Sequence, residues 1–177
     1  MKEVEVKYSV KNFKNIKHLL KRFGFKKAKT KEYEDYYYTD KDWKFIRNET
    51  CLRLRRYKDK TVLTYKPRTV KNVAIKSKTE VETIVDFKSM HKVLIGLGYV
   101  LAVNFNKRSD EYKKGKLTVS LDIVGKKRYV EVEVLAYNTK LAKERIKRIV
   151  QELDLKHVEM RNYRDLMIGY NRYAKKS

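Results

Sequence analysis

The strongest constraint on this sequence is an alternation of apolar and charged residues that returns in one short segment after another. It begins in residues 2–8, where valines alternate with Glu3, Glu5 and Lys7. Successive side chains of a strand point to opposite faces, so this segment has one apolar and one charged face. One interpretation is an ordinary strand at the wet face of a sheet. The other is a carboxylate pair that holds a divalent metal, followed by an ammonium group that holds the anion carried by the metal.

The same patterning predicts eight strands and four helices. The expected strands are residues 2–8, 33–39, 51–57, 61–66, 79–85, 100–112, 117–124 and 128–135. Apolar residues at helical spacing predict helices at residues 12–23, 87–97, 140–153 and 163–173. Residues 40–50 are expected to form a loop, and the basic stretch 67–78 a flexible excursion. No repeat or linker divides the sequence, so we expect a single domain over residues 1–177.

Seven of these strands combine an apolar face with a charged or polar face, and the charged faces hold both signs. Beyond the first strand, the residues concerned are Arg53, Arg55, Thr64, Lys66, Lys78, Glu80, Glu82, Asn104, Asn106, Arg108, Ser120, Asp122, Glu131 and Glu133. One explanation is a sheet with a wet side and a dry side. The other is a closed barrel with a charged interior and helices covering its apolar outside. Because dry charges are too costly to bury, that interior must be a watered tunnel holding ions or a charged ligand.

The net charge narrows the range of partners. Lys and Arg number 45 against 22 Asp and Glu, a formal charge of +23. This excess favours polyanions: nucleic acid, anionic membranes or phosphorylated small molecules. No apolar run approaches the ~20 residues of a membrane span, so we expect no membrane partner. The single cysteine, Cys51, excludes an intramolecular disulfide and indicates a reducing, cytoplasmic location.

Eight short segments carry the charged residues in a characteristic order. They are Glu-x-Glu-x-Lys at 3–7, Leu-Arg-Leu-Arg at 52–55, Leu-Thr-Tyr-Lys at 63–66, Glu-x-Glu at 80–82, Lys-Arg at 107–108, Asp122, Val-Glu-Val-Glu at 130–133 and Asn-Tyr-Arg-Asp-Leu at 162–166. In this order the sequence resembles the CYTH superfamily of triphosphate tunnel metalloenzymes, over about residues 3–167, and it is most similar to the CyaB-type class IV adenylyl cyclases. The resemblance implies an α+β fold with an eight-stranded, closed antiparallel β-barrel, a charged interior and flanking helices.

The resemblance also implies a role for each charged residue. The metal ligands for Mg²⁺ or Mn²⁺ would be Glu3, Glu5, Asp122, Glu131 and Glu133, with Glu80 and Glu82 either binding metal or supporting the ligands. The triphosphate would be held by Lys7, Arg53, Arg55, Lys66, Lys78 and Arg108. The catalytic residues would be Glu3, Glu5, Lys7 and Arg55. These assignments suit the chemistry, since Mg²⁺ prefers oxygen ligands and arginine binds phosphate through two prongs.

Two positions depart from the family pattern. Lys78 stands where the family often has arginine, and lysine lacks the two-pronged fork. Asn106 stands where the first of two inward basic residues is usual. We therefore expect Arg108 to point inward and Lys107 outward, and a part for Asn106 or Lys107 in phosphate binding stays open.

The resemblance implies an enzyme that converts ATP to cyclic AMP and pyrophosphate. The alternative is a triphosphatase that hydrolyses inorganic triphosphate, thiamine triphosphate or a nucleoside triphosphate. Both reactions need nearly the same residues, so the sequence leaves them open. The expected partner is a small-molecule triphosphate; nucleic acid is not expected, because inward glutamate pairs repel phosphate unless metals intervene. A homodimer would cover apolar faces such as that of Val130, Val132 and Val134, but so would the helices.

Overall fold

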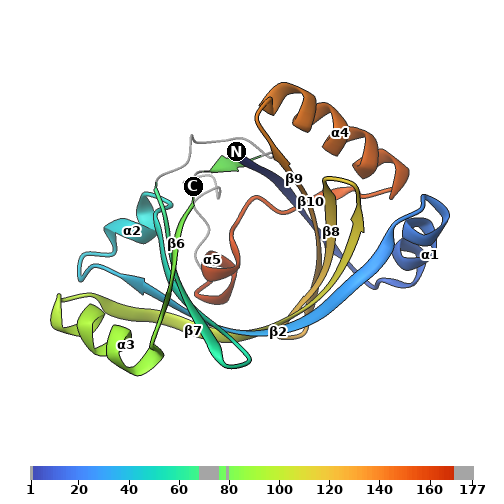
Figure 1. Ribbon diagram of the computed structural model, residues 1–177. Helices are drawn as coiled ribbons and strands as arrows, with labels where there is room; N and C mark the ends of the chain where they lie inside the picture. The colour runs from blue at the N-terminus through green and yellow to red at the C-terminus, as the bar shows by residue number, and fades with distance from the viewer. Residues whose placement is uncertain (1, 68–75, 79, 170–177) are drawn as a thin grey trace. The chain divides into compact units, whose positions relative to one another are not determined.

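A computed structural model of the protein describes residues 2–67, 76–78 and 80–169, and for residues 2 and 76–78 it describes the backbone alone. It is an α+β structure built on an antiparallel sheet (Figure 1). The strands are β1 (Lys2–Val10), β2 (Lys26–Thr39), β3 (Cys51–Tyr57), β4 (Lys60–Lys66), β5 (Lys76–Lys78), β6 (Val81–Val85), β7 (Val100–Lys114), β8 (Leu117–Val124), β9 (Lys127–Ala136) and β10 (His157–Val158). The helices are α1 (Lys14–Arg22), α2 (Lys44–Arg47), α3 (Phe87–Gly96), α4 (Thr139–Glu152) and α5 (Tyr163–Met167). Within the described ranges, every helix is too short or too polar to cross a membrane.

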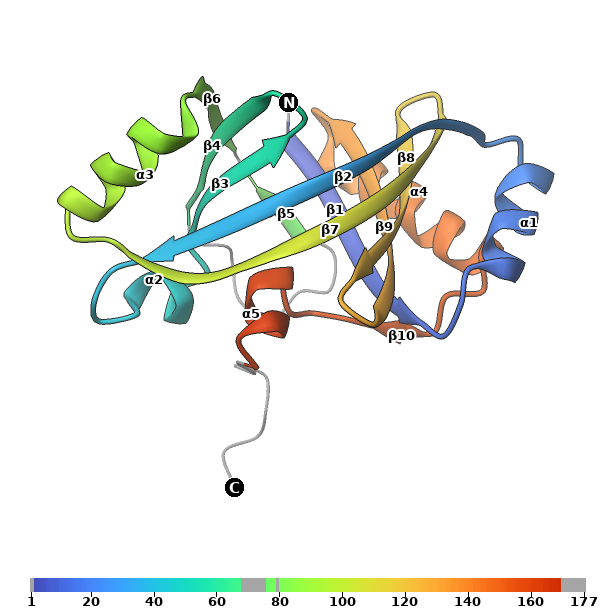
Figure 2. The ribbon, with the colours of Figure 1, turned by 90° about the horizontal axis from the view of Figure 1, so that it is seen from below.

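The strands follow the order β10-β1-β9-β8-β7-β2-β3-β4-β6, and β5 also pairs with β1. All eight predicted strands are present, and the two further strands, β5 and β10, are only 3 and 2 residues long. The longest strands, β2 and β7, are neighbours in the sheet and run side by side in Figures 1 and 2. The α+β antiparallel fold is therefore confirmed, while closure of the sheet into a tunnel stays a prediction.

The chain divides into two compact units. The first contains β1, α1, β5, β8, β9, α4 and β10, together with residues 26–31 of β2 and 108–114 of β7. The second contains β3, β4, β6, α2, α3 and α5, with residues 32–39 of β2 and 100–107 of β7. The two long strands thus contribute to both units. A single domain over residues 1–177 stays a prediction.

The apolar face of the first unit is covered by a helix of the same unit. Val130, Val132 and Val134 on β9 are at most 1% exposed and belong to one core with Ile146 and Ile149 of α4. The valines of β1 join this core, which leaves the charged residues of β1 and β9 on the opposite face of the sheet. The valine face that suggested a homodimer is therefore already covered, and a homodimer stays a prediction.

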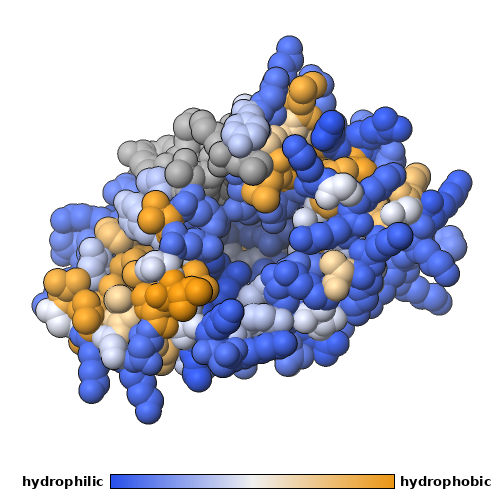
Figure 3. Space-filling view, in the orientation of Figure 1, coloured by the Kyte–Doolittle hydropathy of each residue, from blue (hydrophilic) through white to orange (hydrophobic). Residues whose placement is uncertain are grey.

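The second unit buries its apolar face in the same way. Tyr38, Leu52 and Leu54 form a core with Leu94 of α3. The helix begins at Asp86, whose carboxylate accepts a hydrogen bond from the backbone N–H of Ser89 at 2.8 Å, an N-cap. The outer side of α3 is apolar as well, as the orange area over this helix in Figure 3 shows, and its exposed side chains include Val93, Ile95 and the following Leu97. Because α3 occupies the apolar face, the polar residues of these strands share the other.

The structure also differs from the sequence predictions at the start of β2, in residues 40–50 and in the last helix. β2 begins at Lys26 rather than at residue 33. The prediction began too late because the lysines of residues 26–31 carry no apolar signal. In the structure the Lys31 ammonium group lies 2.6 Å from the carboxylate of Glu111 on β7. The predicted loop 40–50 contains α2, which follows Trp43 in a left-handed conformation at φ 59°. The predicted helix 163–173 is the short α5, and its last residues, like most of the basic excursion 67–78, lie outside the described residues.

Helix α5 is held in the second unit by a buried arginine. The side chain of Arg164 is 1% exposed and donates to the carbonyl oxygens of Thr50 at 2.6 Å and Ile46 at 3.4 Å. Its Nη2 also lies 2.9 Å from the carboxylate of Asp165. This residue, part of the Asn-Tyr-Arg-Asp-Leu segment, therefore joins α5 to the α2–β3 connection.

Replacing Arg164 by leucine is expected to lower the free energy of unfolding by about 3–5 kcal/mol, because it leaves the Asp165 carboxylate buried without its counter-charge. Urea unfolding followed by circular dichroism measures the loss. Arg148→Leu is the matched control, since the Arg148 side chain is 81% exposed and pairs with Glu152 on the surface of α4. That change should cost about 0.5 kcal/mol or less. Equal losses in the two variants would contradict a specific role for Arg164.

Candidate functional site

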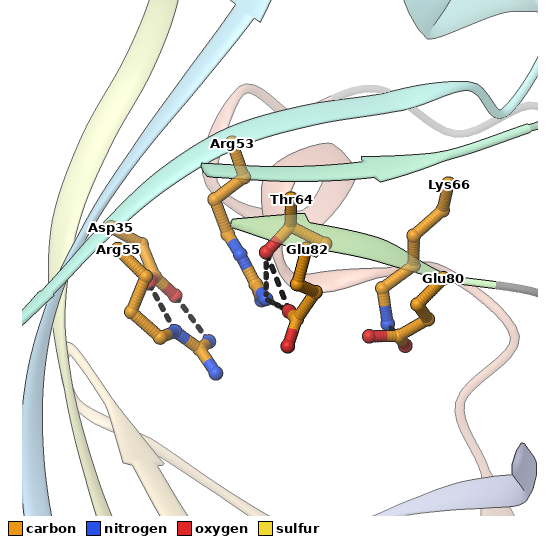
Figure 4. Close-up of polar contacts among 7 residues, drawn as sticks. All are labelled: Asp35, Arg53, Arg55, Thr64, Lys66, Glu80 and Glu82. Atoms are coloured by element: carbon orange, nitrogen blue, oxygen red, sulfur yellow. Dashed lines mark hydrogen bonds and ion pairs between the residues drawn. The ribbon is translucent and has the colours of Figure 1, made fainter. Parts of the chain in front are cut away.

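The polar face of the second unit carries a row of charged side chains from four strands. They are Asp35 of β2, Arg53 and Arg55 of β3, Thr64 and Lys66 of β4, Glu82 of β6 and, just before β6, Glu80. Figure 4 shows that these side chains project to the same side of the strands. The register explains the grouping, because Asp35 lies opposite Arg55, while Arg53, Thr64 and Glu82 form one line across β3, β4 and β6.

A two-pronged ion pair fixes Arg55. Its Nε and Nη2 donate to the two carboxylate oxygens of Asp35 at 2.6 and 2.7 Å. Asp35 is fully buried, and burial alone would raise its pKa; the charge and hydrogen bonds of Arg55 outweigh this and hold the pKa below its ordinary value of 3.8. Asp35 therefore stays ionised and keeps the guanidinium in one orientation.

Arg53 lies deeper on the same face, with 8% of its surface exposed. Its Nη2 donates to the Thr64 hydroxyl at 3.1 Å and lies 3.8 Å from the carboxylate of Glu82. The Thr64 hydroxyl in turn donates to Glu82 at 2.7 Å. The Nε of Arg53 is buried and has no hydrogen-bond partner in the described part of the chain. A buried donor in this state is costly unless a ligand accepts from it.

The orientation predicted for β7 was wrong. Lys107 is only 7% exposed, and its ammonium group lies 5.6 Å from the centre of the Tyr33 ring and 4.9 Å from that of Tyr163, whereas Arg108 is exposed. The prediction placed Asn104, Asn106 and Arg108 on the polar face, which leaves the alternate residue Phe105 on the apolar face. Its ring instead stacks on Tyr37 at 5.6 Å, so an aromatic pair lies among the charges and Lys107 follows it on the same face.

The buried part of this cluster carries more positive than negative charge. Arg53, Arg55 and Lys107 face one fully buried carboxylate, that of Asp35, and the positive charge of Lys107 also helps to lower the Asp35 pKa. Lys66 forms an ion pair with Glu80 further along the face. A buried donor is costly without a partner, so the Arg53 Nε, which has none in the described part of the chain, favours an anionic ligand on this face. An anion with several oxygens would suit the arginine donors best.

The first unit brings the predicted metal ligands together on one face of β1, β8 and β9. The side chains that alternate with its core are Glu3, Glu5, Lys7, Asp122, Glu131 and Glu133. Glu5 lies directly opposite Glu133, and Lys7 lies opposite Glu131, with 3.7 Å between the Lys7 ammonium group and the Glu131 carboxylate. Asp122 is fully buried. The remaining predicted residue, Lys78, pairs with Glu3 through the backbone, and its side chain lies outside the described residues.

The donor chemistry of this face fits a hard divalent cation. All five predicted ligands are carboxylates, and the opposed Glu5 and Glu133 place like charges next to each other, an arrangement that disfavours a sheet unless a cation offsets it. Among the described residues, no three His, Cys, Asp or Glu side chains are grouped closely enough to hold a metal as they stand. The backbone thus places the ligands on one face, and metal binding would have to draw their side chains together.

The pKa of Asp35 predicts a loss of stability in acid. Because the folded-state pKa lies below 3.8, the Asp35 carboxylate stabilises the fold above that pH, and the stabilisation disappears as the pH falls through the folded-state pKa. We expect the urea concentration at the unfolding midpoint to decrease as the pH is lowered below 3.8. In Asp35→Asn this decrease should be less steep. Urea titrations at successive pH values measure the slopes, with the exposed Asp42→Asn as a control of wild-type slope. The same slope in all three proteins would contradict the assignment.

Sequence reasoning missed Asp35, Lys107 and Tyr163 as members of the polar face. The aromatic run in β2 conceals the alternate set Tyr33, Asp35 and Tyr37, since tyrosines occupy both faces of the strand. The opposite face carries Glu34, Tyr36 and Tyr38 at the same spacing, so the residue types of β2 do not distinguish its two faces. The contact of Tyr163 with Lys107 joins residues far apart in sequence, and no local pattern indicates it.

The family model of the CYTH domain matches residues 1–163. The chain belongs to the CYTH domain family. CYTH enzymes bind triphosphates and in general depend on metal ions, which agrees with the donors on the two faces.

Individual CYTH relatives support the same fold. A Methanocaldococcus jannaschii protein, a candidate adenylate cyclase by name, is 30% identical over 125 residues, 70% of this chain and 71% of that protein. The solved structure of the PH1012 protein from Pyrococcus horikoshii has a TM-score of 0.82 at 28% identity, covering 96% of this chain and 99% of the other. A Hippeastrum protein, described as a candidate adenylyl cyclase with dominant triphosphatase activity, has a TM-score of 0.72 at 16% identity, covering 96% and 97%. The last likeness shows the fold alone.

Proposed function

We propose that this CYTH protein is a metal-dependent enzyme that acts on a triphosphate and, most specifically, a class IV adenylyl cyclase that converts ATP to cyclic AMP and pyrophosphate. The observation that carries the proposal is the Arg53 Nε, a buried donor with no hydrogen-bond partner among the described residues, on the face that also carries Arg55 and Lys107. An anionic ligand would accept from this donor. The name of the M. jannaschii relative favours the cyclase reaction.

The basic residues would bind and orient the phosphates. Asp35 takes up Nε and Nη2 of Arg55, so phosphate would meet the remaining Nη1, and Arg53 would donate from Nε. Lys107, which replaces Arg108 in the proposed set, would add a point charge from β7. Lys66 would contribute once phosphate displaces Glu80, and Lys7 once phosphate displaces Glu131. Each contact supplies fixed positive charge in a region of low dielectric.

In the cyclase reaction the ribose 3′-oxygen forms a bond to the α-phosphorus as the bond from that phosphorus to the bridging oxygen of the β-phosphate breaks. The 3′-hydroxyl gives its proton to solvent water, and pyrophosphate leaves with the electron pair of the broken bond. Mg²⁺ or Mn²⁺, held by Glu3, Glu5, Asp122, Glu131 and Glu133, would lower the pKa of the attacking hydroxyl and neutralise phosphate charge. Arg53 and Arg55 would stabilise the charge that develops on the leaving pyrophosphate, so catalysis is mainly positioning and electrostatics.

A second candidate is hydrolysis of a terminal phosphate of inorganic triphosphate, thiamine triphosphate or a nucleoside triphosphate. The structural likeness to the Hippeastrum protein, described with a dominant triphosphatase activity, favours it. The same cations would hold the chain of phosphates, and water would replace the 3′-hydroxyl as the attacking group. For either reaction we propose a small-molecule triphosphate as the partner and the cytoplasm as the location, the latter because the chain has a single cysteine.

Product analysis separates the two reactions. The purified protein is incubated with ATP or with tripolyphosphate, in Mg²⁺ or Mn²⁺, and the products are resolved by anion-exchange chromatography. Cyclic AMP and pyrophosphate from ATP, lost on addition of EDTA, are the expected result. Orthophosphate from tripolyphosphate without any cyclic AMP would overturn the cyclase proposal in favour of the second candidate. No product and no binding of either compound would overturn both.

A further inference from the structure

The ring of Tyr33 is in contact with two of the cations on the polar face of the second unit. The guanidinium carbon of Arg55 lies 4.2 Å from the ring centre, and the ammonium nitrogen of Lys107 lies 5.6 Å from it. The ring of Tyr57 also packs on the ring of Tyr33, with 5.5 Å between the ring centres and a tilt of 46°. One aromatic side chain thus joins a cation of β3 to a cation of β7.

Two like charges near one ring need an attractive group to hold them there. The face of a tyrosine ring attracts a cation, and the attraction grows when water is excluded, as it is for the 7% exposed Lys107. Tyr33 also precedes Asp35 by two residues, so both side chains lie on the same face of β2. Asp35 fixes the orientation of the Arg55 guanidinium through two hydrogen bonds, and the Tyr33 ring adds an attraction to its positive charge.

We propose that Tyr33 is a positioning residue, which holds Arg55 and Lys107 together in the arrangement that binds a triphosphate. This inference rests on the proposed triphosphate chemistry and extends it to a residue that itself carries no charge. The ring acts through the two cations and takes no part in bond breaking. Tyr33 therefore controls the affinity for the phosphate chain and leaves the rate of the chemical step nearly unchanged.

The test uses binding of a triphosphate in which CH₂ groups replace both bridging oxygens, so that neither reaction can cleave it. Its Kd is measured by calorimetry on the full chain with Mn²⁺. We expect Tyr33→Leu to raise the Kd about tenfold, as for the loss of two cation–ring contacts, while Tyr33→Phe, which keeps the ring, stays within about twofold of wild type. With the cleavable substrate, Tyr33→Leu should raise KM and change kcat by less than about twofold.

A double-mutant cycle shows whether the ring acts through its cations. In a Lys107→Met background, Tyr33→Leu should raise the Kd only about threefold, because one of the two contacts has already gone. Tyr99→Leu is the matched control: this ring packs on Phe45 at 5.4 Å in the core of the second unit, away from the charged residues. The control should leave the Kd unchanged, and urea unfolding of every variant separates loss of binding from loss of folding.

The possible failures are distinguishable. If the wild type binds the analogue and Tyr33→Leu binds it equally well, the positioning role is wrong and the proposed function stands. Equal losses in Tyr33→Phe and Tyr33→Leu would assign the effect to the hydroxyl group and overturn the role of the ring. A full tenfold effect in the Lys107→Met background would show that the ring does not act through Lys107. A wild type that does not bind the analogue would overturn both the inference and the proposed function on which it rests.

Discussion

Replacing Arg55 by alanine is expected to lower kcat/KM for the triphosphate about 30- to 900-fold, the equivalent of about 2–4 kcal/mol of transition-state stabilisation. The expectation follows from the position of the guanidinium. Asp35 holds it through Nε and Nη2, so its remaining donors are oriented before substrate arrives. A donor oriented in advance stabilises developing charge without reorganisation. Steady-state kinetics on ATP and on tripolyphosphate with Mn²⁺ measure the loss.

Two further variants make the Arg55 result specific. Arg56→Ala removes the neighbouring arginine, whose side chain is 46% exposed and pairs with Glu34 on the other face of β3. It should change kcat/KM by less than about twofold, since a surface ion pair contributes little. Removing Arg55 alone also leaves the buried Asp35 without its counter-charge, so the double variant Arg55→Ala with Asp35→Ala tests the loss in a chain that buries no unpaired carboxylate. Near wild-type efficiency in that double variant would contradict the role of Arg55.

Alternation of residue types was sufficient to predict the strands and most of the charged faces. In β1, β8 and β9 the valines and Leu121 that alternate with the charged residues enter one core, so Glu5, Asp122 and Glu133 lie on the opposite face. The helices were predictable for the same reason: the apolar stripe of α4 is the surface that covers those strands. Where local pattern and packing partner agree, the sequence alone determines the face.

The predictions were wrong where the polarity of a residue differs from that of its surroundings in the fold. Phe105 is apolar but stacks on Tyr37 among charges, which displaced the predicted face of β7 by one residue and pointed Lys107 outward. A one-residue change reverses every side chain of a strand, so a single aromatic residue was enough. The first residues of β2 carry no apolar signal. Lys27 and Lys31 are instead held by ion pairs with Asp110 and Glu111 of β7, which only the folded sheet brings near them. Such pairings over long sequence distances do not appear in a local window.

Glu5→Gln is expected to lower the metal-dependent activity about 100-fold or more. Loss of a residue that only hydrogen-bonds to a metal ligand typically costs about 10- to 100-fold, and loss of a ligand itself costs more. Glu5 lies on β1 directly opposite Glu133, so it is central to the carboxylate face of the first unit. Glutamine keeps the size and one oxygen of the side chain but carries no charge for the cation. The measurement is product formation over a range of Mn²⁺ concentrations, with Glu144→Gln, an exposed glutamate of α4, as a control of wild-type activity.

Thermal unfolding tests the same residue without activity as the readout. A metal that binds only the folded chain stabilises it by about 2.7 kcal/mol at a concentration of 100 times its Kd, so Mn²⁺ should raise the Tm of the wild type and of Glu144→Gln. In Glu5→Gln the Tm should respond weakly to Mn²⁺. In EDTA, however, the Tm of this variant should stay close to that of the wild type, because Glu5 lies opposite both Glu133, a residue of like charge, and Lys76, a residue of opposite charge. A variant that loses stability in EDTA and keeps its full response to Mn²⁺ would show that Glu5 supports the sheet and does not bind the metal.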